Sequence, residues 1–121
     1  MAWFKVDDKL HSHPKVLGVS LRAMGLWVKA GSWCADQLTD GHIPRAALAP
    51  LNATTADANA LVTAGLWLET DGGWRFRDWG DYQPTKDQVE KRRAEDAQRK
   101  ADARAARAAA RAADQQAVEG K

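Results

Sequence analysis

The sequence of 121 residues has only one cysteine, no long apolar run and no apolar stretch near its start. Each of these features excludes a class of protein. One thiol, Cys34, excludes a disulfide framework and a thiolate metal cluster, and it suits a reducing compartment. No apolar run approaches the ~20 residues that span a bilayer. The opening residues 1–8 lack the apolar core of a secretion signal. We therefore expect a cytoplasmic protein without membrane association.

Motifs that support catalysis or metal binding are also missing. The sequence contains no glycine-rich phosphate loop, no nucleophile-elbow sequence and no carboxylate pair on a defined scaffold. Cys34 falls on the apolar side of a predicted helix, where a small buried thiol is expected. His11 and His13 give only a weak metal spacing and suit capping and packing, and His42 lies far away. The sequence predicts no enzyme, no bound metal and no cofactor.

Charge and aromatic residues are unevenly distributed along the chain. Residues 1–84 contain all six tryptophans and carry 8 basic and 9 acidic side chains, a net charge of −1. Residues 85–121 contain no tryptophan and carry 10 basic and 7 acidic side chains, a net charge of +3. We expect a packed domain over 1–84 and an Ala/Arg-rich helical tail over 85–121, with a disordered end.

The first third of the chain predicts one strand and two helices. The aromatic and branched residues 3–6 predict a short strand. Ser12 is a candidate cap for a short helix that enters through Pro14. A longer helix begins at about Ser20, and Trp27 and Cys34 widen its apolar face. The main apolar positions of that face follow the helical period: Leu17, Leu21, Met24, Val28, Gly31 and Ala35.

The middle of the chain predicts short elements joined by turns. Residues 39–41 form a turn, 42–43 a very short strand, and 45–49 a short helix between two prolines. After a turn at 51–53, Thr54 begins a helix with a capping-box pattern in which Asp57 replaces the usual Glu or Gln. This helix ends at Gly65. Its predicted buried residues are Ala58, Leu61 and Val62.

Residues 66–78 predict a hairpin with alternating polarity on both arms. A three-residue loop over 71–73 pairs Leu68 with Phe76 and Glu69 with Arg75, whereas a two-residue loop pairs Leu68 with Arg75. We therefore expect the three-residue loop, because it avoids setting an apolar residue against a charge. Leu66, Leu68 and Phe76 then face the core.

The order of these elements is that of a winged helix-turn-helix, with the recognition helix at 54–64 and the wing tip at 71–73. The predicted fold class is mainly α with a small β-hairpin (α+β), followed by a long C-terminal helix.

Short motifs in order along residues 1–90 resemble actinobacterial phage and prophage proteins described as replication-initiation or helix-turn-helix DNA-binding proteins. These proteins look like relatives of the N-terminal module of DnaD-type helicase loaders. The resemblance implies a role in replication initiation. The motifs are residues 3–8 (WFKVDD), 11–16 (HSHPKV), 25–27 (GLW), 30–33 (AGSW), 38–41 (LTDG), 65–67 (GLW), 73–74 (GW), 78–79 (DW) and 82–85 (YQPT).

Four residues of the predicted domain are candidates for contact with double-stranded DNA. On the recognition-position helix, Asn59 has the groups to bridge adenine N6 and N7, and Thr55 suits a phosphate or a thymine methyl. This helix has no Lys or Arg, and its Asp57 would repel DNA, so its exposed side is alternatively a packing surface. Arg75 and Arg77 suit a groove or phosphate, or else pair with Glu69 and with the Trp67 ring respectively.

The tail provides the clearest candidate for nucleic-acid contact. At ~100° per residue, five cations fall within ~60° of one another and form a stripe about 27 Å long. Such a stripe suits a phosphate backbone without sequence preference. Alternatively, the stripe is incidental to high-GC coding, solvated, or beside a loose helix–helix contact. The five cations are Arg93, Lys100, Arg104, Arg107 and Arg111.

Together these features predict a phage or prophage DNA-binding protein acting in replication initiation or its regulation, with a homodimer as one possible form. Two alternatives use the same architecture. In the first, the near-neutral domain is an adaptor that docks on a helicase, loader or host factor. In the second, the protein is a transcriptional regulator.

Overall fold

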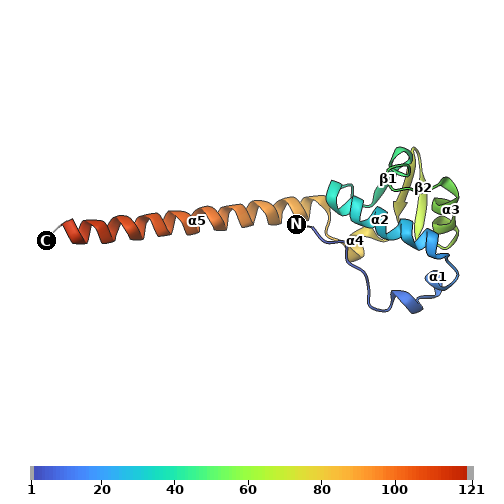
Figure 1. Ribbon diagram of the computed structural model, residues 1–121, viewed down its shortest axis with the longest axis horizontal. Helices are drawn as coiled ribbons and strands as arrows, with labels where there is room; N and C mark the ends of the chain where they lie inside the picture. Colours follow the sequence, from blue (N-terminus) through green and yellow to red (C-terminus); the bar gives the residue numbers. More distant parts are fainter. Residues whose placement is uncertain (1, 120–121) are drawn as a thin grey trace. The chain divides into compact units, whose positions relative to one another are not determined.

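The computed structural model describes residues 2–119, and the chain divides into two compact units, Met1–Lys86 and Asp87–Lys121. The first unit, called the body below, holds every strand and all the short helices (Figure 1). Its elements are η1 (Leu10–Ser12), α1 (Pro14–Leu17), α2 (Leu21–Gln37), β1 (His42–Pro44), η2 (Arg45–Ala47), α3 (Thr55–Thr63), β2 (Trp67–Thr70), β3 (Gly73–Phe76) and α4 (Trp79–Tyr82). The helix α5 (Lys86–Glu119) follows.

The predicted combination of helices with a small antiparallel sheet and a long C-terminal helix is confirmed. The sheet has three strands in the order β1-β3-β2, and both pairings are antiparallel. The helix α5 extends to Glu119, so of the tail end that we expected to be disordered only residues 120–121 lie outside the described part of the chain.

The strand predicted over residues 3–6 is wrong, because this segment has neither helical nor strand structure. Its backbone is held by a side chain instead. Lys5 donates its N–H to Gln83 Oε1 (2.8 Å), and its carbonyl accepts from Gln83 Nε2 (2.6 Å). The buried amide of Gln83 therefore takes the place that a neighbouring strand would have.

The predicted cap of α1 is also wrong by one residue. His13 is the N-cap, and its Nδ1 accepts a hydrogen bond from the Lys15 N–H at 3.2 Å. Ser12 lies in η1 and donates its hydroxyl to the Lys9 carbonyl. His13 has the extended backbone that an N-cap requires, and Pro14 follows it at the first helical position.

The predicted apolar face of α2 is correct in part. Trp27, Cys34 and two smaller residues of the predicted face are buried, but the centre of the buried face is rotated from the predicted one by roughly 100°, or one residue step. Leu21 is 92% exposed and Val28 is 48% exposed, and Leu17 in α1 is exposed as well. Ser20 is the N-cap as predicted, since its hydroxyl accepts from the Ala23 N–H. The buried face centres on large side chains with alanines between them, which allows close packing: Ala23, Leu26, Trp27, Ala30, Gly31, Cys34 and Ala35.

This rotation gives opposite expectations for two leucines of α2. Leu21→Ala should change the free energy of unfolding by less than about 0.5 kcal/mol, because the side chain is already exposed. Leu26→Ala should cost about 2–5 kcal/mol, since Leu26 is 3% exposed and its loss leaves a cavity. Urea unfolding of both variants measures the difference. A larger cost at Leu21 would show that the predicted face is the buried one.

The middle of the body follows local rules closely. The capping box of α3 is present: the Thr54 side chain accepts from the Asp57 N–H, and the Asp57 carboxylate accepts from the Thr54 N–H. Ala58 and Leu61 are buried as predicted, whereas Val62 is half-buried. The helix expected over 45–49 is the shorter turn η2. The helix α4, which we did not predict, follows β3.

The hairpin has a two-residue loop, Asp71–Gly72, so the predicted three-residue loop is wrong. Trp67 lies opposite Phe76, and Leu68 lies opposite Arg75. This register faces three aromatic rings to the core, whereas the predicted register would have exposed Trp67. Burying a tryptophan removes about 150–250 Å² from water, worth about 4–6 kcal/mol, against about 1.5–3 kcal/mol for a leucine. The larger aromatic term outweighs the Leu68–Arg75 mismatch.

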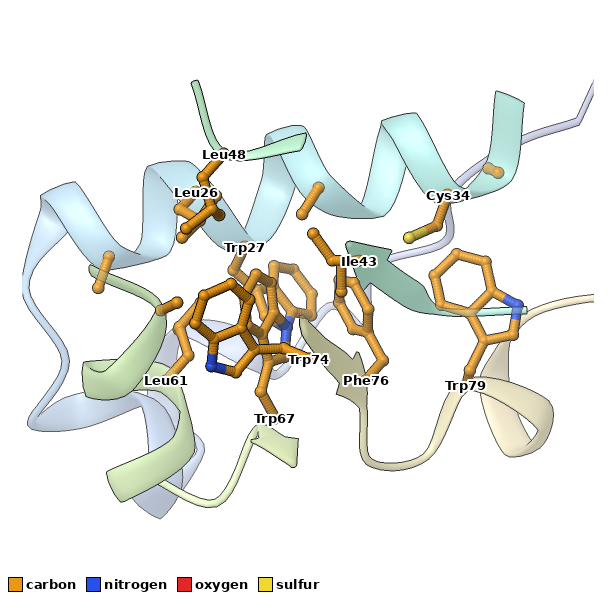
Figure 2. Packing of buried hydrophobic residues seen from close by; sticks show 14 residues of the cluster. Leu26, Trp27, Cys34, Ile43, Leu48, Leu61, Trp67, Trp74, Phe76 and Trp79 are labelled. Carbon is orange, nitrogen blue, oxygen red and sulfur yellow. The ribbon is translucent and has the colours of Figure 1, made fainter. Parts of the chain in front are cut away.

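The core of the body lies between α2, α3 and the inner face of the sheet (Figure 2). Trp67 and Trp74 are fully buried, together with Ile43 from β1 and Leu61 from α3. The ring centroids of Trp67 and Phe76 are 5.5 Å apart in an edge-to-face arrangement. The other face of the sheet is exposed to solvent, and it carries Arg75, the one charged side chain of β3.

Candidate nucleic-acid interface

The exposed side of α3 carries the two residues of this helix predicted to contact DNA, Thr55 and Asn59. Thr55 and Asn59 are both exposed, and their four-residue spacing places them on one face of the helix. Ala56, Ala60 and Thr63 are also exposed. The face therefore offers one amide and two hydroxyls but no charged side chain.

Asp57 does not lie on this face, and its carboxylate is paired with Arg22. The residue is 8% exposed, and its Oδ1 accepts a hydrogen bond from Arg22 Nε at 2.8 Å. The hydrogen bond from the Thr54 N–H, together with the bond and charge of Arg22, lowers the pKa of Asp57 below its ordinary value of 3.8. The carboxylate thus joins α2 to the start of α3.

This contact makes the stability of the body depend on pH. A carboxyl whose pKa is lowered by folding contributes stability above its unfolded pKa, and this contribution is lost as the pH falls through the folded pKa. Asp57→Asn should therefore lower the free energy of unfolding by about 1–2 kcal/mol at pH 7. The difference between the two proteins should shrink below about pH 4. Urea unfolding at pH 7 and pH 3 tests this, and a constant difference would contradict it.

The outer face of the sheet presents Arg75 and, just beyond β3, Arg77, both exposed. Arg75 lies opposite His42 of β1 and Leu68 of β2 in the ladder. The predicted pairing of Arg75 with Glu69 is therefore wrong. In the described part of the chain neither Arg75 nor Arg77 forms an ion pair. Both guanidinium groups are available to an anion.

The predicted contact between Arg77 and Trp67 is also wrong, because Trp67 is fully buried on the inner face. Arg45, which is not among the predicted residues, pairs with Glu69 and lies over a different tryptophan ring, that of Trp74. Its guanidinium lies 4.8 Å from the centroid of the Trp74 ring, and its Nη2 is 3.2 Å from Glu69 Oε1. No linear spacing indicates this, since Arg45 and Glu69 are 24 residues apart.

The five predicted cations of the tail lie on one continuous helix, α5, and all are exposed. At about 100° per residue this continuity keeps Arg93, Lys100, Arg104, Arg107 and Arg111 on one side, and they are called the basic stripe below. Among the described residues none of the five forms an ion pair.

Two acidic side chains of α5 have partners on the same helix: Asp96, which lies beside the basic stripe, and Asp102. Asp96 bonds to Arg99, and Asp102 accepts from Gln98 Nε2 at 2.9 Å. Asp102 lies about 180° from Arg93 around the helix, on the opposite side from the basic stripe. From residue 99 to residue 111 the helix carries five cations and one acid, so this segment has a net charge of +4.

The remaining candidate residues have structural roles. Cys34 is fully buried, as predicted, and burial raises the pKa of its thiol to about 11, so it is protonated at neutral pH. His13 caps α1. Over residues 2–119 no group of three or more His, Cys, Asp or Glu side chains is placed to hold a metal ion.

Comparison of the chain with protein-family models, with curated proteins and with solved structures finds no match. The resemblance to phage replication proteins therefore stays a prediction. Among the helices over residues 2–119, none combines the length and apolar character needed to cross a membrane.

Proposed function

We propose that this chain is a phage or prophage DNA-binding protein that acts in replication initiation or its regulation. The basic stripe of α5 carries the proposal. Five exposed cations on one side of a continuous helix, without ion pairs among the described residues, match the requirements of non-specific phosphate binding.

The order of elements in the body supports a winged helix as the finer description of the fold. The order α2, β1, η2, α3, β2, β3 is the order expected of a winged helix, in which α3 would be the recognition helix. The Asp71–Gly72 loop is then the tip of the wing, and Arg75 and Arg77 lie along one of its strands and just beyond. In this arrangement the body would position the protein on the duplex, and the basic stripe would provide most of the affinity.

The salt dependence of duplex binding by the full chain tests this function. Five phosphate contacts predict that the logarithm of the association constant falls with the logarithm of salt concentration with a slope of about −4 to −5. Fluorescence anisotropy with a random-sequence duplex at 50 mM and 200 mM salt measures the slope. Absence of binding at 50 mM salt, or a slope near zero, would overturn the proposal.

Base reading by α3 is a separate prediction. Asn59→Ala should relax the preference for adenine at one position of a selected site, at a cost of about 1–3 kcal/mol for the preferred base. Selection from a randomised duplex library, with the wild-type chain in parallel, provides the measurement. Unchanged specificity would exclude this helix as the reader.

The uncharged exposed face of α3 favours a second function. With no Lys or Arg over residues 55–63, the helix lacks the phosphate contacts that usually accompany readout. In this second function the body is an adaptor that docks on a helicase, loader or host factor, and contact with DNA is secondary.

A further inference from the structure

A groove of about 380 Å³ lies in the body between the N-terminal segment and the region from β3 to α4. Its volume is within the range of ordinary ligand sites. Aromatic rings form much of its wall, and their edge-to-face and stacked contacts hold them in place. These rings are Phe4, Trp27, Phe76 and Trp79. Two further wall residues, Val6 and Tyr82, are 49% and 64% exposed.

The same groove is lined by three lysines, Lys5, Lys9 and Lys15. None of the three forms an ion pair within residues 2–119. Two acidic residues, Asp7 and Asp78, also line the groove, so they offset part of the positive charge of the lysines. Asp7 accepts a hydrogen bond from the backbone N–H of Lys9, and Asp78 makes no side-chain capping bond to α4. An apolar wall with three available cations complements a ligand that joins an apolar group to negative charge.

Two observations favour a peptide over a nucleic acid. Trp27, Phe76 and Trp79 are each less than 10% exposed, so their ring faces are covered and offer no platform on which bases could stack. The backbone of Phe4 and Val6, on either side of the Lys5–Gln83 contact, makes no hydrogen bond within the described chain. An extended peptide can use such free backbone groups and place one apolar side chain against the exposed Val6 and Tyr82.

We propose that this groove binds an acidic peptide segment of a partner protein. One large apolar side chain of the peptide would lie against Val6 and Tyr82, and the carboxylates of the peptide would lie against the lysines. The groove is distinct from the basic stripe, from the exposed face of α3 and from Arg75 and Arg77. Its occupancy is therefore independent of duplex binding, and each can fail without the other.

Selection of displayed random peptides on the full chain tests the proposal. The expected consensus is a large apolar residue flanked by Asp or Glu. A labelled peptide with this consensus should bind in fluorescence anisotropy, and its amide shift changes in NMR should fall on residues 4–16 and 76–83. Two matched peptides, with Ser for the apolar residue or Lys for the acids, should not bind.

Charge reversal locates the site. Lys9→Glu together with Lys15→Glu should weaken the peptide about tenfold or more, because both ammonium groups line the groove. The control, Lys29→Glu together with Lys91→Glu, makes the same change of charge outside the groove. Its affinity for the peptide should stay within about twofold of the wild-type value. Val6→Asp is a second test variant, because Val6 is exposed and its replacement does not disturb the core. The new carboxylate should repel the acidic peptide and weaken its binding. Far-ultraviolet circular dichroism and thermal unfolding confirm that each variant is folded.

Three outcomes would overturn the proposal: no acidic and apolar consensus, equal effects of the two double variants, or shift changes outside the groove. A single-stranded oligonucleotide that displaces the peptide, and that the Lys9 and Lys15 reversals weaken, would assign the groove to nucleic acid instead. Peptide binding in a chain that fails to bind duplex would support the adaptor function. Duplex binding without peptide binding would leave only the basic stripe.

Discussion

Gly73→Ala should lower the free energy of unfolding of the body by about 3 kcal/mol or more. A Cβ at position 73 would lie 2.1 Å from the carbonyl oxygen of Ile43 and 3.0 Å from Pro44 Cα. These are backbone atoms of β1, so no side chain can rotate away. The strand β1 must instead move from β3, which weakens the ladder hydrogen bonds and opens the core around Ile43.

This loss is a large fraction of the free energy of unfolding, because domains of this size have a total stability of about 5–15 kcal/mol. Gly25→Ala is the matched control, since its Cβ meets nothing within 4 Å and its backbone is helical. The same substitution should stabilise the chain there by about 0.5–1 kcal/mol. Urea unfolding of both variants gives the two values. If the two substitutions changed the free energy of unfolding by similar amounts, β1 would not approach β3 as described.

Neutralising three cations of the basic stripe should reduce duplex binding by about two orders of magnitude at 0.1 M salt. The variant replaces Arg104, Arg107 and Arg111 by Gln. Each lost phosphate contact lowers the salt slope by about 0.9, so the slope should fall by about 2.7. Glutamine is a good helix former, so α5 should persist, and circular dichroism checks this.

The control has an equal loss of charge on other sides of the same helix. Lys91, Arg92 and Arg99 lie at least about 60° from every member of the basic stripe, and Arg99 is bonded to Asp96. Replacing these three by Gln should change the salt slope by less than about 1. Equal effects of the two triple variants would mean that net charge, and not the position of the cations, determines binding.

Interactions within a few residues of the chain could be predicted from the sequence. Ser20 begins α2, the Thr54–Asp57 capping box begins α3, and Gly65 follows the end of α3 with a φ of 82°. The exposed positions of Thr55 and Asn59 follow from that start, because it sets the phase of the helix. The basic stripe depends only on a continuous helix, which the tail composition favours.

Interactions between distant residues could not be predicted in the same way. The Arg45 contacts with Trp74 and Glu69 join η2 to the hairpin, and the Gln83 contact joins the α4 end to the N-terminal segment. Each contact depends on the position of an element in the tertiary structure, and not on whether the element is a helix, a strand or a turn. The groove also could not be predicted from local sequence, since its walls combine residues from the beginning and the end of the body.

The sequence by itself therefore determined the starts of α2 and α3, the presence of a small antiparallel sheet and the cationic side of α5, because short-range hydrogen bonds, alternating polarity and helical periodicity fix them. Only the tertiary structure decided which face of α2 is buried and which register the hairpin adopts. Several faces and registers satisfy local patterning, and the choice depends on packing the largest side chains together. Burial of Trp27, Trp67 and Trp74 selects one of them, at the cost of an exposed Leu21 and a Leu68 set against Arg75.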